Sequence, residues 1–291
     1  MTCMKANEVR YADVGPVRLA YESFGTAGRP ALLLVMGQGA QMLAWPDGFC
    51  RALAERGLHV VRFDNRDAGL STHLRHRRLA LSPYTLDDMA TDTLRLMDVL
   101  GLRAAHLVGI SMGGMLAQLL AIRHPARVLS LTCIASSTGS RRAGWPRPSL
   151  LRRIPLRRTV SDRDGAGDLF VRVLQAIGSP AYPVDVAHVR ALGSCCYDRG
   201  YDPRGSLRHL LAVVRAPDRT SALQQLRVPS LVVHGTADPL VPVSGGRALA
   251  WAIPGARSVT VPGMGHDLPP QLWPLLVDEI HAVVVRGSAH Q

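Results

Sequence analysis

Hydrophobic residues along this chain fall into two alternating patterns. Short runs of branched apolar residues, typical of strands that are buried on both faces, are separated by longer stretches with helical spacing. Alternation of this kind predicts βα units on a largely parallel sheet. The predicted strands are residues 9–11, 17–21, 31–35, 58–63, 104–108, 128–135, 229–235 and 257–261. The first two flank Gly15-Pro16 and predict an opening hairpin.

One predicted helix has clearly marked ends. It follows Tyr84, and Thr85 and Asp88 have the spacing of a capping box, with an acid in place of the usual Glu or Gln. Its apolar residues lie on one face, and Gly101 ends it. The other predicted helices are residues 114–121, 166–177, 184–195, 206–214 and 271–285.

The alternation breaks between residues 138 and 226. This segment has no convincing parallel strand, and helical patterns follow a start that is dense in Arg, Gly and Pro. We therefore expect a core domain formed by residues 1–137 and 227–291. The segment 138–226 is expected to be a helical cap, inserted before the strand that leads to Asp238.

Bulk properties limit the class of protein. A chain of 291 residues with 47% hydrophobic residues can bury a full core. It has no run of 18 apolar residues, and residues 1–15 lack the apolar segment of a signal peptide. The five cysteines fit no metal or disulfide framework. We therefore expect a cytoplasmic protein with no membrane segment; oligomeric state cannot be inferred from these features.

The net charge of +12 does not by itself indicate a nucleic-acid partner. Lys5 is the only lysine, so nearly all the positive charge is arginine, as coding bias in a GC-rich genome would produce. The arginine clusters at 75–78 and 152–158 are expected to be solvated surfaces. With no accompanying nucleic-acid motif, the sequence predicts a small-molecule substrate instead.

The segment Gly109-Ile110-Ser111-Met112-Gly113 has the form of a nucleophile elbow. Such an elbow holds a serine on a sharp turn between a strand and a helix, with its hydroxyl exposed above the sheet. The five-residue pattern is weak evidence alone, because the chain is rich in Gly and Ser. Its context strengthens it: a predicted strand leads directly into it and a predicted helix leads directly out.

A base and an acid follow the serine in the order that this type of site requires. A serine hydroxyl needs a base to take its proton and a third group to orient that base. Asp238 follows the predicted strand 229–235, and His266 follows the next strand. Both positions are loops at carboxyl ends of strands, where an open α/β sheet places its site. Asp267 follows the histidine directly and is expected to point elsewhere.

Other histidines and the oxyanion donors can also be assigned. His106, His124 and His234 lie in or beside core elements and are expected to be structural. The reaction needs N–H donors for the developing oxyanion, and the backbone N–H groups of Met112 and Gln38 are the candidates. A purely structural role for the Gly-rich turn around Gln38 remains an alternative.

These residues resemble the α/β-hydrolase superfamily over nearly the whole chain. The loop 64–71, DNRDAGLS, is similar to the family's D-x-R-x-x-G-x-S loop, which is usually structural. Within the superfamily, the sequence resembles bacterial methylesterases that tailor aromatic polyketides (anthracyclines). The matching stretches are residues 32–37, 45–47, 57–60, 111–113 and 262–266.

The resemblance implies roles for individual residues. Ser111 would be the nucleophile, His266 the base and Asp238 its orienting acid, with Gln38 and Met112 at the oxyanion hole. Met36-Gly37 stands where the family usually has His-Gly, a departure that the methylesterases share. Gln38 is larger than the residue expected at its position, which bears on substrate fit. The cap shows little recognisable similarity.

An apolar pocket is a further expectation. Its candidate lining residues are Met42, Trp45, Met115, Trp145 and Phe170, and core packing explains each of them equally well.

The function predicted from the sequence is hydrolysis of a carboxylic ester through an acyl-enzyme, with neither a cofactor nor a metal. The resemblance suggests a methyl ester of a bulky, polyketide-derived natural product. One alternative is a non-hydrolytic enzyme of natural-product biosynthesis (a cyclase, a lyase or a carbon–carbon bond-forming enzyme) in which His266 acts as acid or base. Another is a non-catalytic small-molecule receptor. Fold alone does not decide among them.

Overall fold

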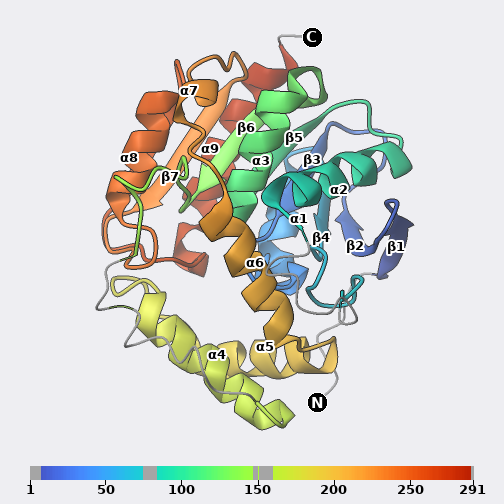
Figure 1. Ribbon diagram of the computed structural model, residues 1–291, viewed down its shortest axis with the longest axis vertical. Helices are drawn as coiled ribbons and strands as arrows, with labels where there is room; N and C mark the ends of the chain where they lie inside the picture. Colours follow the sequence, from blue (N-terminus) through green and yellow to red (C-terminus); the bar gives the residue numbers. More distant parts are fainter. Residues whose placement is uncertain (1–7, 75–83, 147–149, 151–159, 290–291) are drawn as a thin grey trace.

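A single twisted sheet forms the centre of the protein (Figure 1). The structure is a computed structural model and describes residues 8–74, 84–146, 150 and 160–289. The eight strands are β1 (Arg10–Asp13), β2 (Arg18–Phe24), β3 (Ala31–Val35), β4 (His59–Phe63), β5 (Ala105–Ile110), β6 (Val128–Ile134), β7 (Ser230–Gly235) and β8 (Arg257–Val261).

The strand order is β1-β2-β4-β3-β5-β6-β7-β8. The β1/β2 and β2/β4 pairs are antiparallel, and every other pair is parallel. Strands β3, β5 and β7 are buried along their whole length, as expected for strands covered on both faces. Because β3 and β5 are neighbours, the loop after β3 lies beside the predicted elbow after β5.

Helices cover both faces of the sheet and form two apolar layers with it. On one face pack α2 (Leu86–Val99), α3 (Met112–Arg123) and α8 (Val243–Ala252). On the other pack α1 (Asp47–Glu55) and α9 (Trp273–Ser288). The short 3-10 helices are η1 (Met42–Ala44), η2 (Pro125–Arg127) and η4 (Pro270–Leu272).

Among the described residues between β6 and β7, four α-helices are formed: α4 (Arg163–Ile177), α5 (Val186–Asp198), α6 (Pro203–Arg215) and α7 (Thr220–Leu223). In Figure 1, α4 and α5 lie apart from the sheet at the lower end of the molecule, and α6 runs from them up across the front of the core. We call α4, α5 and α6, together with the segments that join them, the cap. The extent of the cap domain, residues 138–226, stays a prediction.

Most of the expected elements are present, and the α/β-hydrolase architecture is confirmed. The capping box of α2 is formed: the Thr85 side chain accepts from the Asp88 N–H, and the Asp88 carboxylate accepts from the Thr85 N–H. Helices α1 and α8 were missed by the periodicity. The arginine clusters at 75–78 and 152–158 lie outside the described residues. No helix in the described part combines the length and apolarity that a membrane span needs.

Candidate active site

Ser111 occupies a strained turn between β5 and α3. Its φ of 55° and ψ of −122° lie where non-glycine residues are rarely found. The backbone around it is tied to the sheet, because the Ser111 N–H donates to the Ile134 carbonyl (2.9 Å) and the Ser136 hydroxyl donates to the Ser111 carbonyl (2.8 Å). This is the geometry of a nucleophile elbow.

Two glycines allow this turn because no side chain would fit at their positions. A Cβ at Gly109 would lie 2.2 Å from the Gly113 carbonyl oxygen, and one at Gly113 would lie 2.0 Å from the Val35 carbonyl oxygen. The G-x-S-x-G pattern is therefore a packing requirement here: helix α3 starts directly against strands β3 and β5.

His266 and Asp238 meet at the carboxyl ends of β8 and β7. The His266 Nδ1 and Asp238 Oδ2 atoms are 2.7 Å apart, and the Asp238 side chain is fully buried. Its other oxygen accepts from the N–H groups of Leu240 (2.9 Å) and Val241 (2.8 Å). The carboxylate therefore has a fixed orientation, and it holds the imidazole with Nδ1 protonated and Nε2 free to accept a proton.

The third feature is the loop of residues 36–42 after β3, which we call the oxyanion loop. A Cβ at Gly37 would lie 3.2 Å from the Ser111 Cβ, so this glycine places the loop against the elbow. Within the described residues, no hydrogen bond occupies the backbone N–H of Gln38 or of Met112. Both donors are thus available for a ligand.

The structure joins His266 to Asp238, but it gives no hydrogen bond from the Ser111 hydroxyl to His266 within the described residues. Such bonds are often long in the absence of substrate and tighten only in the complex. All three predicted residues follow the carboxyl ends of parallel strands, Ser111 after β5, Asp238 after β7 and His266 after β8, and so they lie at the same edge of the sheet.

Comparison with known proteins also indicates a hydrolase site. The family model for the alpha/beta hydrolase fold matches residues 30–160, and a model for TAP-like proteins matches residues 209–271. A rhodomycin D methylesterase from Streptomyces sp. strain C5 is 32% identical over 87% of this chain and 90% of its own length. The chain belongs to the α/β-hydrolase family. The rhodomycin D methylesterase of Streptomyces peucetius is 31% identical over the same shares of the two chains.

Solved structures agree with this assignment. The enol-lactonase from Burkholderia xenovorans LB400 matches with a TM-score of 0.72 and 27% identity, covering 96% of this chain and all of that one. Relatives over nearly the full length are ester-cleaving hydrolases, so the protein is a hydrolase of this superfamily, as its sequence predicted.

The D-x-R-x-x-G-x-S loop of this α/β hydrolase binds the cap to the core. The Asp64 carboxylate accepts from Arg199 of the segment after α5 (2.8 Å), and Asp67 accepts two hydrogen bonds from Arg208 of α6 (both 2.7 Å). Asp67 itself has a φ of 63° and is buried. Burial raises the pKa of Asp64, whereas the hydrogen bonds from Arg208 hold the pKa of Asp67 low against the opposing effect of its burial.

A group of possible metal ligands lies in the same contact. Potential ligand atoms of Asp67, His73 and Asp202 lie within 4.8 Å of one another. Arg208 donates to both carboxylates, with 3.1 Å to Asp202, and so supplies the positive charge that these acids need. We interpret the group as an ion-pair cluster between cap and core.

The five candidate pocket residues are dispersed. Met42 and Trp45 are fully buried, and Trp45 stacks on Phe49 in the apolar layer of α1. Met115 packs in the opposite layer, and Trp145 is 41% exposed. Phe170 lies in α4, where it packs against Gly193 of α5. Their role in binding stays a prediction.

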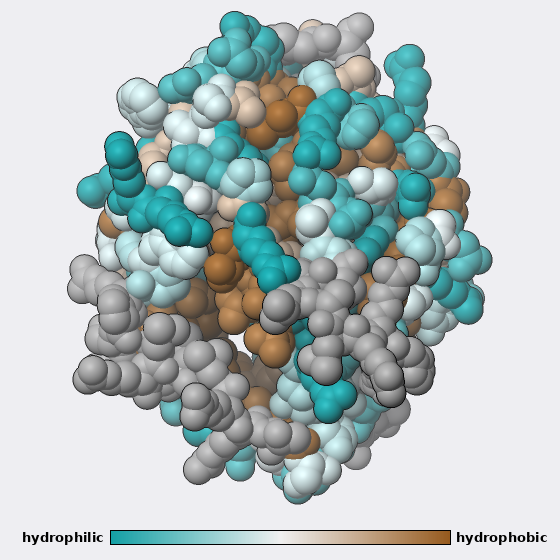
Figure 2. Space-filling model, in the orientation of Figure 1, coloured by the Kyte–Doolittle hydropathy of each residue, from teal (hydrophilic) through white to brown (hydrophobic). Residues whose placement is uncertain are grey.

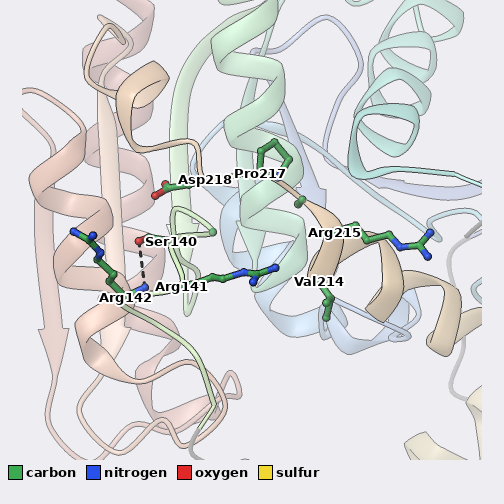
Figure 3. Close-up of a pocket in the computed structure, with 9 residues that line it drawn as sticks. Ser140, Arg141, Arg142, Val214, Arg215, Pro217 and Asp218 are labelled. Carbon is green, nitrogen blue, oxygen red and sulfur yellow. Dashed lines mark hydrogen bonds between the residues drawn. The ribbon is translucent and has the colours of Figure 1, made fainter.

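Two cavities lie near the cap. One, of about 580 Å³, lies between the loop 139–142 and the segment 214–218 at the end of α6 (Figure 3). The side chains of Arg142 and Arg215 extend in opposite directions there, so these guanidinium groups do not converge on one ligand. The other, of about 180 Å³, lies between α4, the segment 178–184 and α5, and Asp267 lines it.

The other buried cysteines and two further histidines do not suit the roles of nucleophile and base. Cys195 is disulfide-bonded, so the expectation that the cysteines fit no disulfide framework was wrong. Burial raises the pKa of the free thiols of Cys50, Cys133 and Cys196 to about 12, so they are protonated at neutral pH. His106 bonds to Ser130, and His234 donates to the Val241 carbonyl. Both rings are buried in the core, in agreement with the structural role expected for them; His234 Nε2 lies 3.6 Å from Asp238 Oδ2, farther than His266 Nδ1 at 2.7 Å.

Sequence reasoning missed two cap residues that contact the candidate site. His209 of α6 accepts a hydrogen bond from the Gly39 N–H of the oxyanion loop, and Ser179 after α4 accepts one from the Gly265 N–H beside His266. No motif marks either residue, because each contact joins segments that are far apart in the sequence.

Proposed function

We propose that this protein hydrolyses a carboxylic ester through an acyl-enzyme, with Ser111, His266 and Asp238 as its catalytic triad. The observation that carries the proposal is the strained Ser111 at the start of α3, at the same edge of the sheet as a loop in which His266 is held by a buried carboxylate. In this family arrangement, serine, acid and histidine follow one another in chain order.

The reaction follows from these positions. His266 Nε2 takes the hydroxyl proton as Ser111 Oγ attacks the ester carbonyl, and the oxyanion accepts hydrogen bonds from the Gln38 and Met112 N–H groups. His266 then gives the proton to the leaving alcohol. Water repeats the attack on the acyl-enzyme and releases the acid.

We further propose that the substrate is a methyl ester of a polycyclic, polyketide-derived compound. The full-length similarity to two rhodomycin D methylesterases supports this class. The surface supports an apolar substrate: apolar residues border a hollow in the lower centre of the face in Figure 2, and α6 on that face exposes Leu207 and Val214.

The test combines active-site labelling with turnover. The wild-type protein should react with a fluorophosphonate, hydrolyse 4-nitrophenyl esters and release methanol from polycyclic aromatic methyl esters. Ser111→Ala should abolish labelling and turnover, and His266→Ala should abolish turnover. Ser137→Ala, a serine at the end of the neighbouring strand, is the matched control and should retain both activities.

The outcomes separate the possible failures. Hydrolysis of aryl esters without release of methanol would contradict the substrate class alone. An activity that survives Ser111→Ala but not His266→Ala would contradict the acyl-enzyme and favour acid–base chemistry by His266. A wild-type protein that neither labels nor turns over any ester would contradict the whole proposal.

A further inference from the structure

Helix α6 contributes one fully buried histidine to the contact between cap and core. His209 has no exposed surface, and its ring lies edge-on to Tyr84 with 6.2 Å between ring centroids. Its Nε2 atom is 2.7 Å from the Arg66 carbonyl oxygen, which can only accept a hydrogen bond. Nε2 therefore carries the proton, and Nδ1 is left as an acceptor.

That acceptor is used by the oxyanion loop. The Gly39 N–H donates to His209 Nδ1 at 3.0 Å. Burial lowers the pKa of His209 to about 4, so the ring is neutral at physiological pH and keeps the free electron pair that this bond needs. A proton on Nδ1 would remove the bond.

The loop also approaches α6 closely at this point. Gly39 has a φ of 65°, and a Cβ there would lie 2.3 Å from the Ser206 hydroxyl oxygen. The Gln38 side chain donates to the Ser206 carbonyl at 3.3 Å. The large Gln38 side chain, unexpected at an oxyanion position, is thus part of the contact with the cap.

Fixing the Gly39 N–H constrains the residue before it. The peptide unit between Gln38 and Gly39 is planar, so its orientation sets the ψ angle of Gln38. The other side of the loop is fixed from the core, because the Asn65 side chain donates to the Met36 carbonyl (3.0 Å) and Asp64 accepts from the Met42 N–H (2.6 Å). The Gln38 N–H lies between these supports.

We infer that His209 is a positioning residue: its neutral Nδ1 atom holds the Gly39 N–H and so orients the Gln38 N–H toward the oxyanion. The inference rests on the proposed function. It gives the cap a part in catalysis in addition to its contact with substrate, since a donor that is displaced by a fraction of an ångström loses much of its effect in the transition state.

Two substitutions test the roles of the two ring nitrogen atoms of His209 independently. In His209→Asn the amide oxygen stands near the position of Nδ1, so the acceptor for Gly39 is kept and the donor to Arg66 is lost. In His209→Gln the amide nitrogen reaches the position of Nε2, so the donor is kept and the acceptor is lost. His106→Gln on β5 is the matched control, because it also removes a buried histidine, one that bonds to Ser130 away from the site.

The readout is kcat and KM for a 4-nitrophenyl ester, per active site titrated with a fluorophosphonate so that only folded protein is counted. We expect His209→Gln to lower kcat about tenfold with KM changed less than about twofold, the pattern of a weakened transition-state contact. His209→Asn and His106→Gln should stay within about threefold of wild type. The affinity for a boronic acid that adds to Ser111 should fall in parallel with kcat.

Equal kcat values for the Asn and Gln variants would overturn the role of His209. Should the Gln variant not fold, the Asn variant decides: a kcat within about threefold of wild type supports the inference, and a tenfold loss overturns it. An inactive wild-type protein contradicts the proposed function, whereas an active one with indistinguishable variants contradicts only the role of His209.

Discussion

The elbow that carries Ser111 and the two loops that complete the site are held by different parts of the protein. Ser111 is bonded to the core alone, through Ile134 and Ser136 on β6 and the loop that follows it. The loop that carries His266 (residues 262–266) is here called the His266 loop. The oxyanion loop is bonded to the cap through His209, and the His266 loop is bonded to it through Ser179. The His266 N–H also donates to the Ile177 carbonyl at the end of α4 (2.7 Å).

This difference indicates that the core and the cap have separate roles in the site. The elbow stores backbone strain, which persists only where the surrounding structure over-determines it, and the sheet provides that support. The other two loops need correct placement relative to Ser111 and to substrate. Support from the cap lets the segment that contacts substrate also set the geometry of the base and the oxyanion donors.

The largest expected effect comes from breaking the support of the elbow. In Gly113→Ala the new Cβ would lie 2.0 Å from the Val35 carbonyl oxygen, inside the sheet, where neither backbone can move freely. We expect the free energy of unfolding, measured in urea, to fall by about 3 kcal/mol, with loss of detectable ester hydrolysis. A soluble variant with wild-type stability would show that the elbow is not constrained by β3.

A glycine-to-alanine substitution in the His266 loop, Gly265→Ala, should have a different effect. A Cβ at Gly265 would lie 2.3 Å from the Gly178 carbonyl oxygen, a contact nearly as short as that at Gly113 but made to the segment after α4. Because this contact is made to a loop and not to a strand of the sheet, we expect the loop to yield and the free energy of unfolding to change by less than about 1 kcal/mol.

Gly265→Ala should nevertheless lower kcat strongly. Moving the imidazole relative to Ser111 by about 1 Å lowers kcat about 100-fold. Urea unfolding and 4-nitrophenyl ester kinetics on both glycine variants test the contrast. If Gly265→Ala destabilised the protein as much as Gly113→Ala, the cap would have to be treated as part of the rigid core.

The same division explains which features the sequence could predict. The strands, the elbow and the order of Ser111, Asp238 and His266 depend on local patterns: apolar runs, glycines at crowded turns and a loop at each strand end. Helix α8 was missed because Gly245 and Gly246 interrupt its pattern, where a Cβ at Gly246 would lie 2.3 Å from His234.

The contacts of the cap could not be predicted in this way. His209 lies 170 residues from Gly39, and Ser179 lies 86 residues from Gly265. Each is an ordinary residue on a helix or in a loop until the cap is placed on the core. The D-x-R-x-x-G-x-S loop is an intermediate case: its resemblance marked it as structural, but only the ion pairs with Arg199 and Arg208 show that it docks the cap.

The smallest effects are expected from removing single hydroxyl groups. One belongs to Ser136 in the core and the other to Ser179 in the cap. Ser136→Ala removes a hydrogen bond to the Ser111 carbonyl, which still accepts from the Gly114 N–H (3.0 Å). Ser179→Ala leaves the Gly265 N–H without its acceptor and removes the hydroxyl that donates to Asp267 Oδ1. Each change should lower the free energy of unfolding by about 1 kcal/mol.

The two variants should differ in kcat, and this difference tests whether the cap positions His266. We expect Ser179→Ala to lower kcat about tenfold, because the backbone beside His266 loses its bond to the cap, whereas Ser136→Ala should stay within about threefold of wild type. Ser179→Thr, which keeps the hydroxyl, should restore most of the lost rate. Equal kcat values for the two alanine variants, at equal stability, would mean that the cap does not position the base, and that the core alone determines the geometry of the site.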